Sequence, residues 1–219
     1  MLNSKQRNKR VKWAKKYLEK GIEFWKRILF SDESSFCIPI GEHGKVWRRK
    51  GEKFRPGRTK LTVKHPASVM IWGSMSSEGL GNLIFMKDRI NSLVYQSILE
   101  DGLLNSTQNI NTSGNMIFQQ DLAPAHNSKS TRTWLENHNI EVLEWPANSP
   151  DLNPIENVWY FIKKSISKCE EPPRTKEQLK TLITKFWSKF SSLKCKELIE
   201  SMPQHCEAVL RSKGFPTKY

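Results

Sequence analysis

Hydrophobic residues follow two spacings along this chain, and each spacing predicts a different kind of element. Short apolar runs rich in β-branched and aromatic residues predict strands, one ending at Asp32 and others over residues 68–74, 79–86, 116–121 and 140–145. Apolar residues three or four positions apart predict helices over residues 3–20, 90–104, 127–137, 175–190 and about 194–211, the last interrupted or split by Pro203. Residues 35–40 and 45–49 are compatible with a hairpin. The alternation of strands and helices indicates an α/β fold, with a mixed central sheet flanked by helices.

One further helix is predicted behind a turn-rich segment, and its start presents an acid. Asn153 followed by Pro154 is typical of a helix N-cap with proline in the first turn, and an apolar stripe follows at helical spacing. Glu156 lies off that stripe. It has two interpretations: a capping-box residue that bonds back to the cap, or a carboxylate presented for chemistry.

Two more acids follow strand-like runs, which favours the second interpretation. Asp121 closes the run 116–121 and is followed within five residues by His126, and 34 residues separate Asp121 from Glu156. Asp32 closes the first predicted strand. Taken singly, an Asp at the end of a strand is also a common turn residue.

The composition narrows the class of protein. The 219 residues suit one domain with a sizeable core, and the net charge of +14 with a pI near 9.7 favours nucleic acid as the partner over an anionic membrane surface. No apolar stretch approaches a membrane span and Met1 opens no signal peptide, so the sequence predicts an intracellular protein. The four cysteines are scattered, which argues against a structural zinc site and for reduced thiols.

Basic residues concentrate in two places. The first is the predicted helix 3–20, where Lys5, Arg7, Lys9 and Arg10 are candidates for phosphate contact or nuclear import, or form a solvated face. The second is the stretch 45–64, which contains the single acid Glu52 and is either a DNA-backbone contact or a solvated insertion. Its nine basic residues are Lys45, Arg48, Arg49, Lys50, Lys53, Arg55, Arg58, Lys60 and Lys64.

The three acids resemble the catalytic triad of the Tc1/mariner superfamily of transposases, in its Tc1-like branch with the 34-residue spacing. The resemblance extends to residues 11–14, 69–73, 201–203 and 217–219 and so covers nearly the whole chain. It implies a ribonuclease H-like fold, with residues 1–25 as a basic helical flanking segment and 26–219 as the catalytic domain, including the C-terminal helices. In this family the 45–64 region resembles a segment that reaches toward the partner subunit and the DNA.

Three carboxylates brought together repel one another and raise each other's pKa. Divalent cations remove that cost, and carboxylate oxygens suit Mg²⁺, with Mn²⁺ as a substitute. Two ions about 4 Å apart would serve phosphoryl transfer, with Asp32 binding both ions and Asp121 and Glu156 one each. His126 either orients a phosphate or a ligand, or bonds a loop carbonyl.

The resemblance implies a nuclear DNA transposase that cleaves double-stranded DNA at transposon ends and joins the freed 3′-hydroxyl to a TA target, acting as a homodimer. Two features depart from the family. Leu122 occupies a position that is Asn in many relatives, and Met1 lies just upstream of the first acid, without the two helix-turn-helix modules of full-length relatives. We therefore expect a fragment, a truncated element or a domesticated remnant.

Two alternatives stay open from the sequence. The first is a non-catalytic DNA-binding or dimerisation module derived from a truncated or domesticated transposase. The second is an unrelated nucleic-acid-binding α/β protein whose acids serve as caps and turns. Separation of residues 32, 121 and 156 in the structure would support the second alternative.

Overall fold

The structure is a computed structural model that describes residues 2–38, 67–86, 90–105 and 116–219. The basic stretch 45–64, the second half of the predicted 35–49 hairpin and most of the Asn-, Ser- and Thr-rich stretch 105–115 lie outside the described residues.

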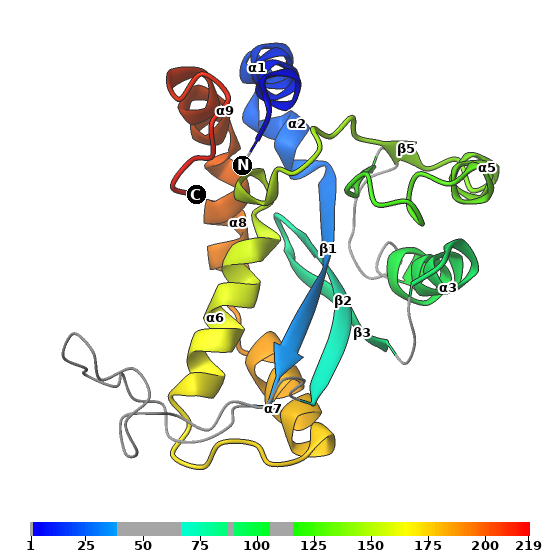
Figure 1. The fold of residues 1–219 in the computed structure, drawn as a ribbon, viewed down its shortest axis with the longest axis vertical. Coiled ribbons are helices and arrows are strands. Elements are labelled where there is room, and N and C mark those ends of the chain that lie inside the picture. The colour runs from blue at the N-terminus through cyan, green and yellow to red at the C-terminus, as the bar shows by residue number, and fades with distance from the viewer. Residues whose placement is uncertain (1, 39–66, 87–89, 106–115) are drawn as a thin grey trace, which may run out of the picture.

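A mixed five-stranded sheet forms the centre of the described chain (Figure 1). Its strands are β1 (Ile28–Cys37), β2 (Ser68–Ser76), β3 (Gly79–Met86), β4 (Ile117–Gln119) and β5 (Glu141–Val142). They lie in the order β3-β2-β1-β4-β5. The first three form an antiparallel meander, whereas β4 runs parallel to both β1 and β5. The predicted mixed sheet is therefore confirmed.

Helices cover both faces of the sheet. Successive side chains of β1 point to opposite faces, so apolar residues of this strand need a covering layer on each side. Ile28 and Phe30 belong to the larger core and Leu29 to the smaller one. The larger core is covered by α1 (Ser4–Leu18), α2 (Ile22–Lys26), α6 (Ile155–Ser167), α7 (Lys176–Ser188), α8 (Ser192–Glu200) and α9 (Met202–Arg211). The smaller core is covered by α3 (Ser92–Ile98), the π-helix η1 (Leu99–Leu104) and α5 (Lys129–Asn137). Figure 1 shows these two groups on opposite sides of β1 and β2.

The first strand departs from the prediction. It continues past Asp32 to Cys37, because β2 pairs with it along its whole second half, from Phe30 opposite Met75 to Cys37 opposite Ser68. Backbone partners supplied by β2 override the turn propensity of the polar residues. The predicted strand end at Asp32 is wrong, and residues 35–37 belong to β1 instead of a separate hairpin.

Most other elements agree with the pattern. The strand over residues 79–86 has the predicted bounds, and the capping box of Thr175 and Gln178 begins α7. The last predicted helix splits at Ser201 into α8 and α9, with Pro203 in the first turn of α9. Residues 90–104 form α3 followed by η1, where Gly102 leaves room for the ring of Trp72. No helix within the described ranges combines the length and apolarity needed to cross a membrane.

The N-terminal helix packs into the larger core. Trp13, Ala14 and Tyr17 are buried there, and α1 lies against α9. Arg10, one of the four basic residues considered for phosphate contact, nuclear import or a solvated face, is fully buried and forms an ion pair with Asp151. Arg10 therefore does not share the solvent-facing side of α1.

Candidate active site

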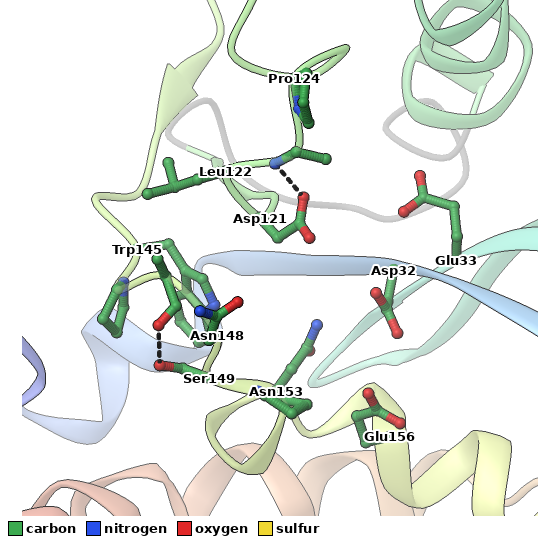
Figure 2. A pocket seen from close by; sticks show the side chains of 14 residues that line it. Asp32, Glu33, Asp121, Leu122, Pro124, Trp145, Asn148, Ser149, Asn153 and Glu156 are labelled. Carbon is green, nitrogen blue, oxygen red and sulfur yellow. Dashed lines mark hydrogen bonds between the residues drawn. The ribbon is translucent and has the colours of Figure 1, made fainter. Parts of the chain in front are cut away.

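The three predicted acids line one cavity of about 470 Å³. Asp32 lies in the middle of β1, Asp121 lies two residues after β4, and Glu156 lies in the first turn of α6. The parallel register explains why Asp32 and Asp121 are close. Strands β1 and β4 pair up to Phe30 opposite Gln119, and Asp32 and Asp121 each lie two positions beyond that pair. Figure 2 shows the side chain of Asp32 between those of Asp121 and Glu156.

Asp32 accepts a hydrogen bond from an indole of helix α6. Trp159 Nε1 donates to Asp32 Oδ2 at 3.0 Å. Gly73, which pairs with Asp32 in the register, makes room for this ring, because a Cβ there would lie 2.8 Å from Trp159 and 2.5 Å from Trp187. Burial, together with the negative charges of Glu33 and Glu156, raises the pKa of Asp32 to about 8. The described chain therefore leaves the charge of Asp32 uncompensated.

Asp121 has a different environment because two donors face it. The Ala123 amide donates to Asp121 Oδ1 at 2.8 Å and His126 Nδ1 lies 2.6 Å from the same oxygen. Burial opposes ionisation of this carboxyl, but the hydrogen bonds from His126 and Ala123 outweigh it and lower the pKa of Asp121. Asp121 is thus kept ionised.

His126 contacts two acids at once. Its Nε2 lies 3.3 Å from Glu33 Oε1, and its ring stacks on Tyr95 with centroids 3.8 Å apart. Burial lowers the pKa of His126, but the bonds to Asp121 and Glu33 outweigh that effect and raise it to about 9. Of its two predicted roles, the contacts fit the orientation of a neighbouring acid, since carboxylates occupy both ring nitrogens.

Glu156 reaches the cavity because Asn153 attaches the start of α6 to β1. Asn153 Nδ2 donates to the Ser31 carbonyl at 3.0 Å, and its Oδ1 accepts from the Ile155 amide at 3.4 Å. The helix proper begins at Ile155, with Pro154 as its N-cap. The backbone N–H of Asn153 donates to the Pro150 carbonyl, so it is not bonded to the side chain of Glu156. The interpretation of Glu156 as a capping-box residue is therefore wrong. Burial raises the pKa of Glu156, although Lys163 opposes this.

Glu33 is a cavity residue that the sequence reasoning missed. It follows Asp32 on β1 and points to the other face of the sheet, toward His126. Its Oε1 is buried and has no hydrogen bond of good geometry within the described chain. The signal was present in the sequence as a second acid beside Asp32, but only the fold shows that both faces of β1 border the site.

Comparison with known proteins identifies the family. The model of the family described as "DDE superfamily endonuclease" matches residues 27–180. The chain is 34% identical to the transposable element Tcb1 transposase of Caenorhabditis briggsae and 33% identical to the Tc1 transposase of Caenorhabditis elegans, in each case over all of this chain and 80% of the relative. The chain belongs to the Tc1/mariner transposases of the DDE superfamily.

Solved mariner structures agree on the fold of this DDE domain. The Mos1 paired end complex with Mn superposes with a TM-score of 0.82 at 23% identity, over 100% of this chain and 65% of that chain. The Mos1 catalytic domain superposes with a TM-score of 0.76 at 21% identity, over 98% of its length. The predicted ribonuclease H-like fold is thus confirmed, and the chain spans about 65% of the Mos1 transposase in the paired end complex.

The donors of this DDE site fit a hard divalent cation. Carboxylate oxygens dominate the titratable cavity lining, which suits Mg²⁺ or Mn²⁺ and disfavours zinc. Burial and the negative charges of Glu33 and Glu156 raise the pKa of Asp32, and a bound cation would offset both effects. Within the described residues, no three His, Cys, Asp or Glu side chains stand in a metal-binding arrangement.

Leu122 lies at the cavity mouth and is 48% exposed. It has no polar group to orient Asp121, and His126 and the Ala123 amide perform that role in this DDE domain. With Leu122 in place of the Asn that the resemblance leads us to expect, Asp121 still has two donors.

Proposed function

We propose that this chain is a catalytic domain that hydrolyses phosphodiesters at transposon ends and then transfers the freed 3′-hydroxyl to target DNA. The observation that carries the proposal is the convergence of Asp32, Asp121 and Glu156 on one cavity. These acids occur in the chain in the order Asp, Asp, Glu, which matches the family designation DDE.

Each acid has a separate part in this scheme. Asp32, the central one, would bind two divalent ions, and Asp121 and Glu156 would bind one each. When bound, such a pair of ions activates the attacking oxygen and stabilises the leaving oxygen of an in-line displacement. His126 and Glu33 position Asp121 from behind, as partners of metal ligands do in other proteins.

The relatives support the substrate. Mos1 has been solved as a paired end complex with Mn and with Mg, and as a strand transfer complex. We propose by analogy that double-stranded transposon ends are the substrate, that TA is the target, that the active form is a homodimer and that the protein acts in the nucleus. The basic residues 45–64 are proposed to contact the DNA backbone, in accord with the net charge of +14.

Cleavage of a pre-nicked duplex in Mn²⁺ tests the proposal. We expect Asp121→Asn and Glu156→Gln to abolish strand cleavage, because each removes a charged metal ligand. Glu177→Gln is the matched control, since Glu177 is an exposed acid in the first turn of α7, and it should retain full activity.

Calorimetry with Mg²⁺ and Mn²⁺ provides the second measurement. The wild type should bind metal in the presence of oligonucleotide, and Asp32→Asn should not. Equal cleavage by wild type and Asp121→Asn would reject the enzyme assignment. Duplex binding without cleavage or metal uptake would establish the non-catalytic DNA-binding module instead.

A further inference from the structure

A second hollow of about 250 Å³ lies beside the acid cavity and has the opposite charge. Lys9, Lys12 and Lys16 of α1 line it; we refer to these three residues as the α1 lysine row. The two hollows share Leu122 and residues 145–147 as lining residues. The α1 lysine row therefore borders the same wall as the acid cavity.

The α1 lysine row is exposed and largely free of protein partners. Its members are exposed on α1, whereas Trp13 and Tyr17 face the core. Helix α1 itself contains no acid. Lys9 and Lys12 form no ion pair with any described residue, and Lys16 pairs with exposed Glu144 at 2.6 Å. Two unpaired cations facing a hollow are available to an anionic ligand.

The position of the row relative to the acid cavity is fixed by buried contacts. Trp13 Nε1 donates to the Glu144 carbonyl at 2.7 Å, and the Trp13 and Trp145 rings meet edge to face at 5.2 Å. One turn before Trp13 in α1, the buried Arg10 forms two hydrogen bonds to Asp151, just ahead of α6. The α1 lysine row is thus joined to the segment that leads to Glu156, and a ligand bound to the row is held beside the acids.

Positive charge beside the acid cavity favours the binding of an anionic substrate. Carboxylates alone repel DNA, and cations next to them supply sequence-independent attraction. We propose that the α1 lysine row binds consecutive backbone phosphates of the DNA strand next to the phosphodiester in the acid cavity. This inference rests on the proposed function and adds a contact on the substrate.

The dimensions agree with a run of phosphates. Lys16 lies seven positions after Lys9, and a helix rises about 1.5 Å per residue, so the row spans about 10 Å. Phosphates of one strand advance about 3.4 Å each along a duplex axis. A row of this length is longer than one such step, so it can contact more than one phosphate of a strand, whereas Arg7 and Arg10 are occupied elsewhere, over Phe215 and on Asp151.

Removal of two charges from the row tests the proposal. The probe is a fluorescent 30-base-pair duplex of arbitrary sequence, with binding followed by anisotropy over a series of salt concentrations. We expect Lys9→Gln/Lys12→Gln to weaken binding and to reduce the slope of log K against log salt by about 2. The matched control is Lys185→Gln/Lys189→Gln, which removes the same charge from exposed positions at the end of α7, a helix that Figure 1 shows apart from α1. Equal losses in the two pairs would overturn the proposal, since they would reflect net charge alone.

A variant of opposite sign excludes misfolding as the explanation. Glu144 is the acid among the lining residues of the second hollow, and it neutralises Lys16. Glu144→Gln should tighten duplex binding and steepen the salt slope by up to about 1. Weaker or unchanged binding would contradict the assignment of Lys16.

Failure of this inference is distinguishable from failure of the proposed function. Lys9→Gln/Lys12→Gln should raise the duplex concentration needed for half-maximal cleavage in Mn²⁺ and keep that cleavage metal-dependent, because the row binds the strand and does not touch the reacting atoms. An unchanged salt slope with metal-dependent cleavage intact would overturn the row alone. Absence of cleavage and of metal uptake in the wild type would overturn the proposed function.

Discussion

Asp151 and Asp32 are two carboxylates near the start of α6 whose pKa values are shifted in opposite directions. Asp151 is partly buried and Asp32 is largely buried. Asp151 accepts two bonds from Arg10, at 2.8 and 2.6 Å, and two more from the amide and hydroxyl of Thr217. Burial opposes its ionisation, but these donors outweigh burial and lower the pKa of Asp151. Asp32 has the Trp159 indole as its side-chain donor, and its pKa is raised to about 8.

The contrast separates a structural acid from a chemical one. The charge of Asp151 is compensated within the chain, and its partners connect α1, the segment before α6 and the C-terminal residues 214–217. The negative charges of Glu33 and Glu156 disfavour ionisation of Asp32, so a charged Asp32 costs the folded protein free energy that its own residues do not offset. Such a cost is expected where an external cation completes the site.

The largest effect is expected from breaking the Asp151 cluster. Arg10→Met leaves Asp151 without its cation, and loss of one partner of a buried pair costs about 3–5 kcal/mol. Urea unfolding at pH 7 measures the change. The stabilisation should be present above the unfolded pKa of Asp151 and disappear as pH falls through its lower folded pKa. A loss below about 1 kcal/mol would show that Arg10 does not hold these segments together.

The opposite result is expected at Asp32. Because its folded pKa is raised to about 8, the folded state binds a proton that the unfolded state lacks between about pH 4 and 8, so the metal-free protein should lose stability as pH rises through that range. Asp32→Asn removes this loss and should stabilise the protein in EDTA at pH 7.5 by on the order of 2–4 kcal/mol. Unfolding curves from pH 5 to 9 measure it, and destabilisation would mean that another group compensates Asp32.

Glu33 and His126, the two side chains behind Asp121, should affect metal binding. Glu33→Gln and His126→Gln each remove one contact of the Glu33, His126 and Asp121 series, and we expect about 10- to 100-fold weaker Mn²⁺ binding or slower cleavage. Calorimetry and the cleavage rate provide the measurements. Exposed Glu136→Gln on α5 is the control, and wild-type metal affinity in both test variants would remove them from the site.

The smallest effect is expected at the junction of α6 with β1. Asn153→Ala leaves the buried Ser31 carbonyl without its donor, which should cost about 1 kcal/mol and weaken metal binding slightly by releasing Glu156. Urea unfolding and calorimetry measure the two effects. Exposed Asn157→Ala, one turn along α6, should change neither, and equal effects in both variants would argue against the Asn153 contact.

Local chemistry determined much of this protein. Periodicity predicted the strands 68–76 and 79–86 within two residues, the helix after Thr175 and the split near Pro203. It also placed Asp121 just after a strand and Glu156 in the first turn of a helix, where side chains are free to converge. These features depend on propensity, capping and spacing, all of which operate over a few residues.

Tertiary structure decided what depended on distant partners. The strand β1 continues past Asp32 because β2 supplies its hydrogen-bond partners. Glu33 belongs to the site because it contacts His126 on the face of the sheet opposite to Asp32. Arg10 is buried because Asp151 and residues 214–215 surround it. The sequence marks Arg10 and Lys9 as equivalent cations of one helix. Only packing separates them, because burial requires a paired charge, whereas an exposed lysine keeps its charge available for DNA.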